Sequence, residues 1–246
     1  MFSLRACWRL WRALVHALIG WATIVLRFPR LPQDQRNVRV QVWARQMLAV
    51  LGVELQVRGT PPAHGPMLLV ANHISWLDIL VMHAARHCRF VSKSEVKHWP
   101  LLGTLATGAG TLYIEREKRR DAMRVVHHVA ERLQAGEILA VFPEGTTSNG
   151  IDLLPFHANL IQSAVSAKAP VQPVGLRFIS TATGQPSLAP CYIGDDTLLG
   201  SFWRTLTAPG GITVVVAYGT AQQAEGRDRR AWAAALQGAV AELREG

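Results

Sequence analysis

The chain has 246 residues, which suffices for one sizeable domain or for one domain with a short appendage. Because 49% of the residues are apolar, a full core can form, and a disordered chain is excluded. The formal net charge of +9 predicts an acidic partner, such as an anionic lipid or an acidic carrier protein. We expect no nucleic-acid partner, because the basic residues are spread along the chain and no zinc-finger or RNA-binding signature appears.

A wide apolar helix is expected over the first thirty residues. At about 100° per residue its polar side chains fall on one narrow stripe, whereas the rest of its circumference is apolar and includes three tryptophans. The stripe consists of Arg5, Arg9, Arg12, His16, Thr23 and Arg27. This pattern is typical of a helix that lies in the membrane interface with its basic stripe toward the headgroups.

Three alternatives to an interfacial helix remain. A spanning helix is one, although the apolar run 13–26 is shorter than the roughly 20 residues that spanning requires. A signal peptide is another, although Arg27-Phe28-Pro29-Arg30 stands where a small-residue cleavage site should be. The third is a helix packed on the protein's own core, which does not explain tryptophans interleaved with arginines.

A second helix, Gln33–Leu51, is expected after the break between Pro29 and Pro32. Arginines again lie beside apolar residues, so the two helices form a plausible membrane-seated hairpin. We therefore predict membrane-associated helices over residues 1–52 and a separate domain over residues 53–246. Three cysteines that are far apart in the chain form no disulfide framework and no metal site, which favours a reducing compartment.

From residue 53 onward, short apolar or β-branched runs alternate with helical stretches. We expect strands at 54–58, 67–71, 89–92, 112–114, 138–142, 172–178 and 212–219, and helices at 76–85, 120–135, 158–167 and 229–245. This alternation predicts an α/β sandwich with a mostly parallel central sheet. Polar residues just past the C-terminal ends of such strands are where ligand sites form.

The segment 71–78, Ala-Asn-His-Ile-Ser-Trp-Leu-Asp, follows one of these strands. A histidine suits a general base, and His73 would be held in one tautomer by Asp78. Residues five apart on a regular helix point about 140° apart, so the two side chains meet only if His73 lies in the turn before the helix. Alternatively, Ser75 and Asp78 form a capping box that satisfies backbone donors at the helix start. Asn72 is expected to shape the turn.

A second segment, 141–146, reads Val-Phe-Pro-Glu-Gly-Thr and follows another apolar strand. Such a turn can present the Glu144 carboxylate, the Thr146 hydroxyl and free backbone N–H groups to a polar ligand. His73 and Glu144 both come just past strand ends, so we expect them to face one cleft.

Together, the two segments resemble the His-x4-Asp and Phe-Pro-Glu-Gly-Thr motifs of the glycerolipid acyltransferases, the family of lysophosphatidic acid acyltransferases. The resemblance extends over roughly residues 50 to 220. It implies a glycerolipid-acyltransferase-like αβ sandwich preceded by two membrane-associated helices. It also implies transfer of an acyl chain from acyl-CoA or acyl carrier protein to the free sn-2 hydroxyl of lysophosphatidic acid, which gives phosphatidic acid. No cofactor is implied, because the donor is itself a substrate.

The same resemblance implies roles for individual residues. His73 and Asp78 become the catalytic pair, and Glu144, Gly145 and Thr146 bind the acceptor, although Glu144 alternatively braces the turn. Arg116, at the end of the segment 113–116, matches a family arginine that contacts the acceptor's phosphate, and a surface arginine is its alternative. The segment 171–174 resembles a family strand near the acyl-donor site. The expected location is the cytoplasmic face of the inner membrane, with peripheral or monotopic attachment to its lipids.

The sequence departs from the family pattern at two cationic positions. The motif commonly ends Gly-Thr-Arg-Ser, whereas Thr147 stands here in place of the arginine. A later Pro-Phe-Lys is replaced by Pro-Phe-His, which ends at His157. Both changes weaken the case for a phosphate-headed acceptor and make another lyso-lipid, such as lyso-ornithine lipid, a rival. A hydrolase that uses water and a non-catalytic lipid-binding protein are the remaining alternatives, and no Gly-x-Ser-x-Gly elbow supports a hydrolase.

The other histidines are given structural interpretations. His83 and His87 lie four residues apart, which is a metal-ligand spacing, but no further ligand pair is evident and we expect them on a helix surface. His127 and His128 are adjacent and point to different faces of their helix. We predict no metal site.

Overall fold

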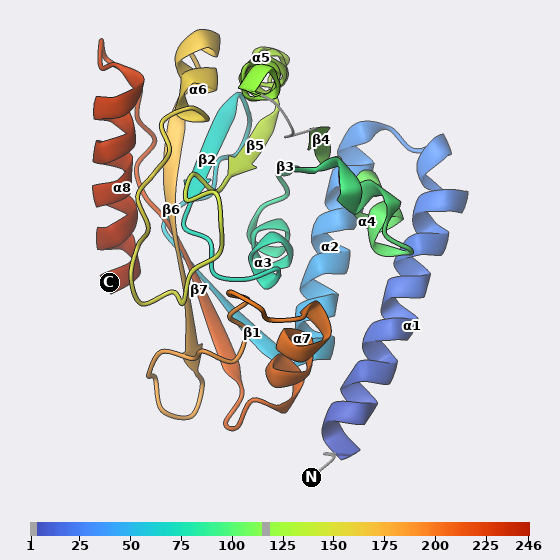
Figure 1. The fold of residues 1–246 in the computed structure, drawn as a ribbon. Helices are drawn as coiled ribbons and strands as arrows, with labels where there is room; N and C mark the ends of the chain where they lie inside the picture. The colour runs from blue at the N-terminus through green and yellow to red at the C-terminus, as the bar shows by residue number, and fades with distance from the viewer. Residues whose placement is uncertain (1–3, 115–118) are drawn as a thin grey trace.

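A computed structural model describes residues 4–114 and 119–246 (Figure 1). In this part of the chain, seven strands form one sheet in the order β1-β7-β6-β2-β5-β3-β4. The strands are β1 (Val53–Arg58), β2 (Met67–Ala71), β3 (Arg89–Lys93), β4 (Leu112–Ile114), β5 (Ile138–Val141), β6 (Val171–Ser180) and β7 (Ile212–Tyr218). Neighbouring strands are parallel except for β6 and β7, which are antiparallel. The predicted mostly parallel α/β sandwich is confirmed.

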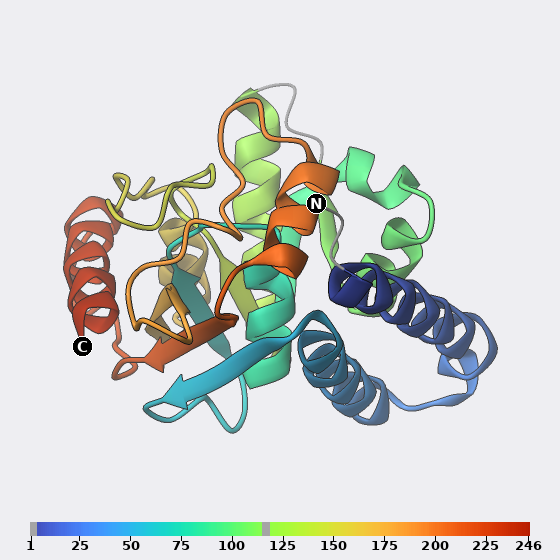
Figure 2. The ribbon, with the colours of Figure 1, turned by 90° about the horizontal axis from the view of Figure 1, so that it is seen from below.

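Helices cover both faces of this sheet. The described helices are α1 (Leu4–Leu26), α2 (Gln33–Leu51), α3 (Leu77–Ala85), α4 (Leu102–Gly108), α5 (Arg119–Gln134), α6 (Ile161–Ala167), α7 (Leu198–Thr207) and α8 (Arg229–Glu245), with 3-10 turns at Phe28–Arg30 and Ser94–His98. One core cluster joins α2, α3 and α7 to the sheet, and the other joins α5, α6 and α8 to its opposite face. Figures 1 and 2 show α8 on one side of the sheet and the α1–α2 pair at the far side.

Every predicted strand is present, with ends that differ by no more than two residues. Helices α4 and α7 were not predicted, and α6 begins at Ile161 rather than at residue 158. α4 has the sequence LGTLATG, whose two glycines disfavour a helix, and it is only 7 residues long. Short helices gain most of their stability from tertiary packing, which local sequence patterns do not report.

The sequence of the central strand β2 is a continuous apolar run because both faces of the strand are covered. Leu69 and Ala71 face one core cluster, whereas Leu68 and Val70 face the other, and all four are buried. A strand covered on both faces has no solvent side, so no apolar–polar alternation appears. Each of the leucine and valine side chains contributes roughly 1.5–3 kcal/mol of stability when fully buried. The buried strand β2 ends at Ala71, where the segment 71–78 begins.

Helix α1 turns a face of small residues toward the protein and a wide apolar face outward. Its buried residues are Ala6, Ala13, Ala17 and Gly20. A Cβ at Gly20 would lie 2.6 Å from the Trp43 indole nitrogen, so only glycine permits this approach of α1 to α2. On the outer face, Trp8 and Trp11 are each 60% exposed. By length and composition, α1 is the one described helix that is apolar enough to cross a membrane. Such an exposed apolar helix indicates membrane association.

The predicted basic stripe of α1 is wrong in part. Arg9 donates to the carbonyl oxygen of Leu206 at 3.4 Å, and the ring of His16 stacks on Trp43 with a centroid distance of 5.2 Å. These two side chains therefore contact α7 and α2 rather than lipid headgroups, whereas Arg5 and Arg12 are exposed. A polar residue that flanks the small-residue face of a helix can bond to a neighbouring helix. Helical periodicity alone does not distinguish such a residue from a solvent-exposed one. The division of the chain at residue 52 stays a prediction.

Gly59, between β1 and β2, provides a test of the fold. Its φ is +70°, and a Cβ there would lie 2.1 Å from the carbonyl oxygen of Tyr218. Gly226 has a similar φ of +79°, but a Cβ there would meet nothing within 4 Å. Alanine at Gly226 should cost about 1–2 kcal/mol of backbone strain, and alanine at Gly59 should cost about 2–5 kcal/mol because it adds a backbone clash. Thermal unfolding in detergent measures both variants, and equal decreases would contradict the predicted close contact.

Candidate active site

His73 and Asp78 are brought together by the turn between β2 and α3. His73 lies two residues beyond β2, and Asp78 lies in the first turn of α3. The His73 Nδ1 atom is 2.8 Å from Asp78 Oδ2. The histidine side chain is 19% exposed, whereas the aspartate is completely buried. Because His73 lies in the turn rather than in the helix, the two side chains can meet. The imidazole extends from the buried carboxylate to the protein surface.

The same carboxylate oxygen also organises the turn. Asp78 Oδ2 accepts hydrogen bonds from the backbone N–H groups of Ile74 at 2.6 Å and Ser75 at 2.9 Å. The two interpretations of Asp78, as partner of His73 and as acceptor for backbone donors at the helix start, thus hold together. Three donors on one oxygen fix the carboxylate rigidly, and the carboxylate in turn fixes the imidazole.

Asn72 holds this turn to the neighbouring strand. Its side-chain nitrogen donates to the carbonyl oxygen of Leu176 at 3.0 Å, and its side-chain oxygen accepts from the Leu176 N–H at 2.7 Å. The amide therefore continues the pairing of β2 with β6 for one position beyond the end of β2. The expected role of Asn72 in shaping the turn agrees with these two bonds.

Glu144 joins the turn after β5 to the turn after β2. Its Oε1 accepts from the backbone N–H of His73 at 2.6 Å, and its Oε2 accepts from the N–H of Leu154 at 3.0 Å. The residue is 3% exposed, and burial raises the pKa of its carboxyl, although the two backbone bonds act against this rise. Both oxygens are occupied by backbone donors, so its observed contacts are those of a brace. Direct contact of Glu144 with an acceptor stays a prediction.

Gly145 and Thr146 form the exposed tip of the same turn. Both are solvent-exposed, and Gly145 has a φ of +73°, a conformation that favours glycine. The exposed side chain of His157 lies beside them, since a Cβ at Gly145 would be 3.3 Å from its ring. The tip is therefore accessible to a ligand while its base is fixed through Glu144. The predicted phosphate contact Arg116 lies outside the described residues.

A loop that the sequence analysis did not identify crosses these turns. Tyr192 donates its backbone N–H to the carbonyl of Ile74 at 3.2 Å, and Ser75 Oγ donates to the carbonyl of Pro190 at 2.5 Å. Thr147, in the position where the family commonly has arginine, donates its hydroxyl to the carbonyl of Tyr192. The threonine at position 147 thus holds the loop 188–193 against the site. Backbone contacts of this kind leave no pattern in the sequence.

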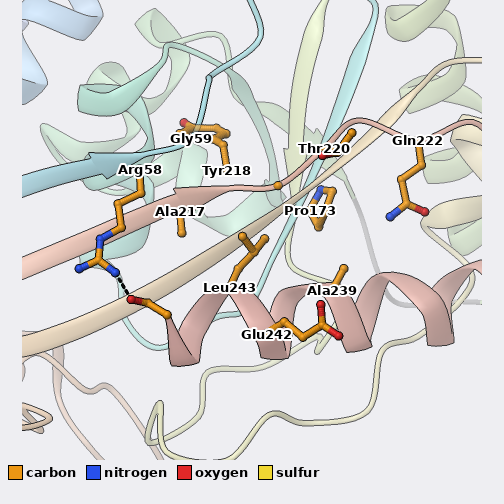
Figure 3. Close-up of a pocket in the computed structure, with 12 residues that line it drawn as sticks. Arg58, Gly59, Pro173, Ala217, Tyr218, Thr220, Gln222, Ala239, Glu242 and Leu243 are labelled. Atoms are coloured by element: carbon orange, nitrogen blue, oxygen red, sulfur yellow. Dashed lines mark hydrogen bonds between the residues drawn. The ribbon is translucent and has the colours of Figure 1, made fainter.

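The groove in Figure 3 lies apart from this site. It has a volume of about 530 Å³ and runs between β1, β6, β7 and the C-terminal half of α8. Pro173, Ala217 and Leu243 line it, and Arg58 at its edge donates to the carbonyl oxygen of Gly246. None of its lining residues belongs to the segments 71–78 or 141–146. Among the residues that line the groove, Pro173 alone belongs to the segment 171–174, which is the predicted donor-site strand.

His83 and His87 are buried, so their predicted place on a helix surface is wrong. Their rings stack with a centroid distance of 5.1 Å, and the edge of His83 meets Phe90. Burial lowers the pKa of His83 well below its ordinary value and lowers the pKa of His87 to about 4. No group of three or more metal-ligating side chains occurs in the described part of the chain.

Comparisons with known proteins place these features in context. A family model described as Acyltransferase matches residues 53–177. A lyso-ornithine lipid O-acyltransferase from Pseudomonas aeruginosa is 41% identical over 202 residues, which are 81% of this chain and 76% of that protein. A 1-acyl-sn-glycerol-3-phosphate acyltransferase from Neisseria meningitidis serogroup B is 40% identical over 199 residues, which are 80% of this chain and 77% of that protein.

A solved structure is similar over nearly the whole length. The crystal structure of the 1-acyl-sn-glycerophosphate (LPA) acyltransferase PlsC from Thermotoga maritima has a TM-score of 0.66 and covers 95% of both chains. Its sequence is 18% identical, so this likeness establishes the fold.

The buried histidine pair predicts acid sensitivity. The pKa of His87 is about 4 in the folded protein and about 6.5 when unfolded, so the unfolded chain alone binds a proton between these values. Above pH 6.5, protonation of His87 takes nothing from the free energy of unfolding. As the pH decreases to 4, this free energy should fall by about 3 kcal/mol because of this group. His87→Leu should reduce this pH dependence in thermal unfolding, whereas His127→Leu, at a side chain that is 78% exposed, should not. The same pH dependence in both variants would contradict the assignment.

Proposed function

Because this chain belongs to the acyltransferase family, we propose that it transfers a fatty acyl chain from a thioester to the free hydroxyl of a lyso-lipid. The observation that carries this proposal is the His73–Asp78 pair, 2.8 Å between Nδ1 and Oδ2, at the end of a central strand. A carboxylate that accepts the proton of Nδ1 leaves Nε2 as the acceptor, which is the arrangement of a general base. The family and the acyltransferase domain are shown by the family model and the relatives, and the fold is shown by the solved structure.

In the proposed reaction, the acceptor hydroxyl takes the place of an enzyme nucleophile. His73 Nε2 removes the hydroxyl proton as the oxygen attacks the thioester carbonyl, and the tetrahedral intermediate then expels the thiolate. The imidazolium returns the proton to this leaving group, so the products are an ester and a thiol. Asp78 stabilises the imidazolium while it exists, because its buried carboxylate remains bonded to Nδ1. No cofactor enters these steps.

Acceptor binding is proposed at the tip of the turn after β5. Gly145 and Thr146 are exposed there, and Glu144 contributes by holding the tip next to His73 through its bond to the His73 N–H. Arg116 is proposed to contact the headgroup, since a guanidinium binds two oxygens of a phosphate at once.

The identity of the acceptor is proposed as lysophosphatidic acid, with lyso-ornithine lipid as the alternative. Relatives named for each activity are nearly equally similar to this chain, at 40% and 41% identity. The alternative is favoured by one specific observation: residue 147 is a threonine whose hydroxyl bonds to the Tyr192 carbonyl, so this position offers no cation to a phosphate. The donor is proposed to be acyl-CoA or acyl carrier protein.

The proposed location is the cytoplasmic face of the inner membrane, where the thioester donor and the lyso-lipid meet. Attachment through the exposed apolar face of α1 supports a peripheral or monotopic arrangement. The lipids of this membrane are the proposed partners of the N-terminal helices.

Transfer from radiolabelled acyl-CoA to a panel of lyso-lipids tests the function. The detergent-solubilised wild type should acylate lysophosphatidic acid or lyso-ornithine lipid. His73→Ala should lower the rate by about 10²–10⁴-fold, because it removes the base. The matched control is His127→Ala, which removes an exposed histidine and should leave the rate unchanged.

The panel distinguishes the alternatives. A preference for lysophosphatidic acid supports the leading acceptor, and transfer only to lyso-ornithine lipid replaces the acceptor while retaining the mechanism. An inactive wild type is tested again with acyl carrier protein as donor. Lipid binding without transfer from either donor, or full activity of His73→Ala, would overturn the proposal.

A further inference from the structure

A column of aromatic rings leads from His73 into the core. The imidazole stacks on Phe142 with a centroid distance of 4.0 Å and an interplanar angle of 6°. Phe142 stacks in turn on Phe90, at 5.7 Å and 19°. Behind Phe90 lies the edge of His83, at 5.1 Å and 78°. The ring of the proposed base is therefore in contact with a chain of three further rings.

We propose that Phe142 is a positioning residue that sets the plane of the His73 imidazole for acyl transfer. The proposal rests on the proposed function of His73 and adds a second restraint to its ring. The bond to Asp78 fixes the direction of Nδ1 but leaves the ring able to rock about the Nδ1–Oδ2 line. A flat surface 4.0 Å away and nearly parallel to the imidazole opposes this rocking. Together, the two contacts determine where Nε2 points.

The position of Phe142 is itself well determined. It follows β5, which pairs in parallel with β2, so Phe142 and His73 emerge from neighbouring strand ends. Its carbonyl oxygen accepts from the N–H of Gly145 at 3.1 Å, within the turn that Glu144 holds to the His73 backbone. The buried side chain of Phe90, on β3, supports the far side of the Phe142 ring. Phe142 therefore cannot shift without moving the turn that also fixes His73.

A purely structural role would give a different experimental result. If Phe142 only fills the core, its replacement by leucine lowers the unfolding temperature but leaves the turnover of the folded enzyme unchanged. If it orients the base, leucine lowers kcat, because a small displacement of a catalytic group reduces the rate strongly. KM should change little, since the bond from Phe142 to the proposed acceptor tip uses its backbone carbonyl, which leucine retains. The aromatic variant Phe142→Tyr should retain the flat contact.

The experiment compares four proteins in the acyl-transfer assay, with unfolding measured for each. Phe142→Leu should lower kcat by about tenfold with KM within about twofold of wild type. Phe142→Tyr should stay within about threefold of the wild-type kcat. Phe178→Leu is the matched control, since the same substitution is made in a buried ring on β6 that is not part of this column, and it should affect unfolding more than kcat.

A double variant shows whether Phe142 acts through His73. In the His73→Ala background, Phe142→Leu should lower the remaining rate by less than about twofold, because no imidazole is left to orient. An unchanged kcat in Phe142→Leu, an equal decrease in Phe142→Tyr, or a full tenfold decrease without His73 would each overturn the inference. Failure of the proposed function is distinguishable, because it would appear as absence of His73-dependent transfer in the wild type.

Discussion

The hydrogen bond from the His73 backbone N–H to Glu144 Oε1, at 2.6 Å, is the constraint on which the site depends. It joins two segments that are 71 residues apart in the chain and that leave neighbouring parallel strands. The strand pairing brings the two turns close, but it leaves their rotation undetermined. A buried carboxylate that accepts from one turn and braces the other removes this freedom. The proposed base His73, its partner Asp78 and the exposed turn tip consequently form one rigid unit.

This unit requires two carboxylates in the interior, which opposes stability. Asp78 is completely buried and Glu144 is 3% exposed, and desolvation of a carboxylate is costly unless hydrogen bonds replace the lost water. The backbone provides such bonds to three of the four carboxylate oxygens: Asp78 Oδ2 accepts from Ile74 and Ser75, and the two Glu144 oxygens accept from His73 and Leu154, whereas Asp78 Oδ1 has no partner in the described part of the chain. Backbone donors are fixed by the fold, so they stabilise the charges without side chains that need ordering of their own. The backbone conformation that positions these residues therefore also supplies hydrogen bonds that offset the burial of the two carboxylates.

Much of this arrangement was accessible from the sequence, because its signals are local. The strands are short apolar runs, and the family predicted from the two motifs is confirmed by the family model and the relatives. The contacts of Asn72 with Leu176 and of Thr147 with Tyr192 join residues far apart in the chain, so no spacing rule reveals them. His83 and His87 were placed on a helix surface, although α3 is covered by α2 and is buried nearly all round, and His87 lies beyond the end of this helix.

Under the proposed function, the residues assigned to acyl transfer and those assigned to the acceptor headgroup differ in their connections to the core. The His73–Asp78 pair, the Phe142 ring and the Glu144 brace are linked through the core and through backbone bonds, so a substitution in any of them disturbs the others. The tip at Gly145 and Thr146 is joined to His73 through Glu144 and the backbone of its turn, whereas the side chains of Thr146 and His157 are exposed. Under the proposed function, we expect replacement of these exposed side chains to change the headgroup preference while the proposed base keeps its position. Relatives named for two different acceptors are almost equally similar to this chain, which agrees with such a separation. The proposed determinant of substrate choice therefore lies among a few exposed residues rather than in the fold.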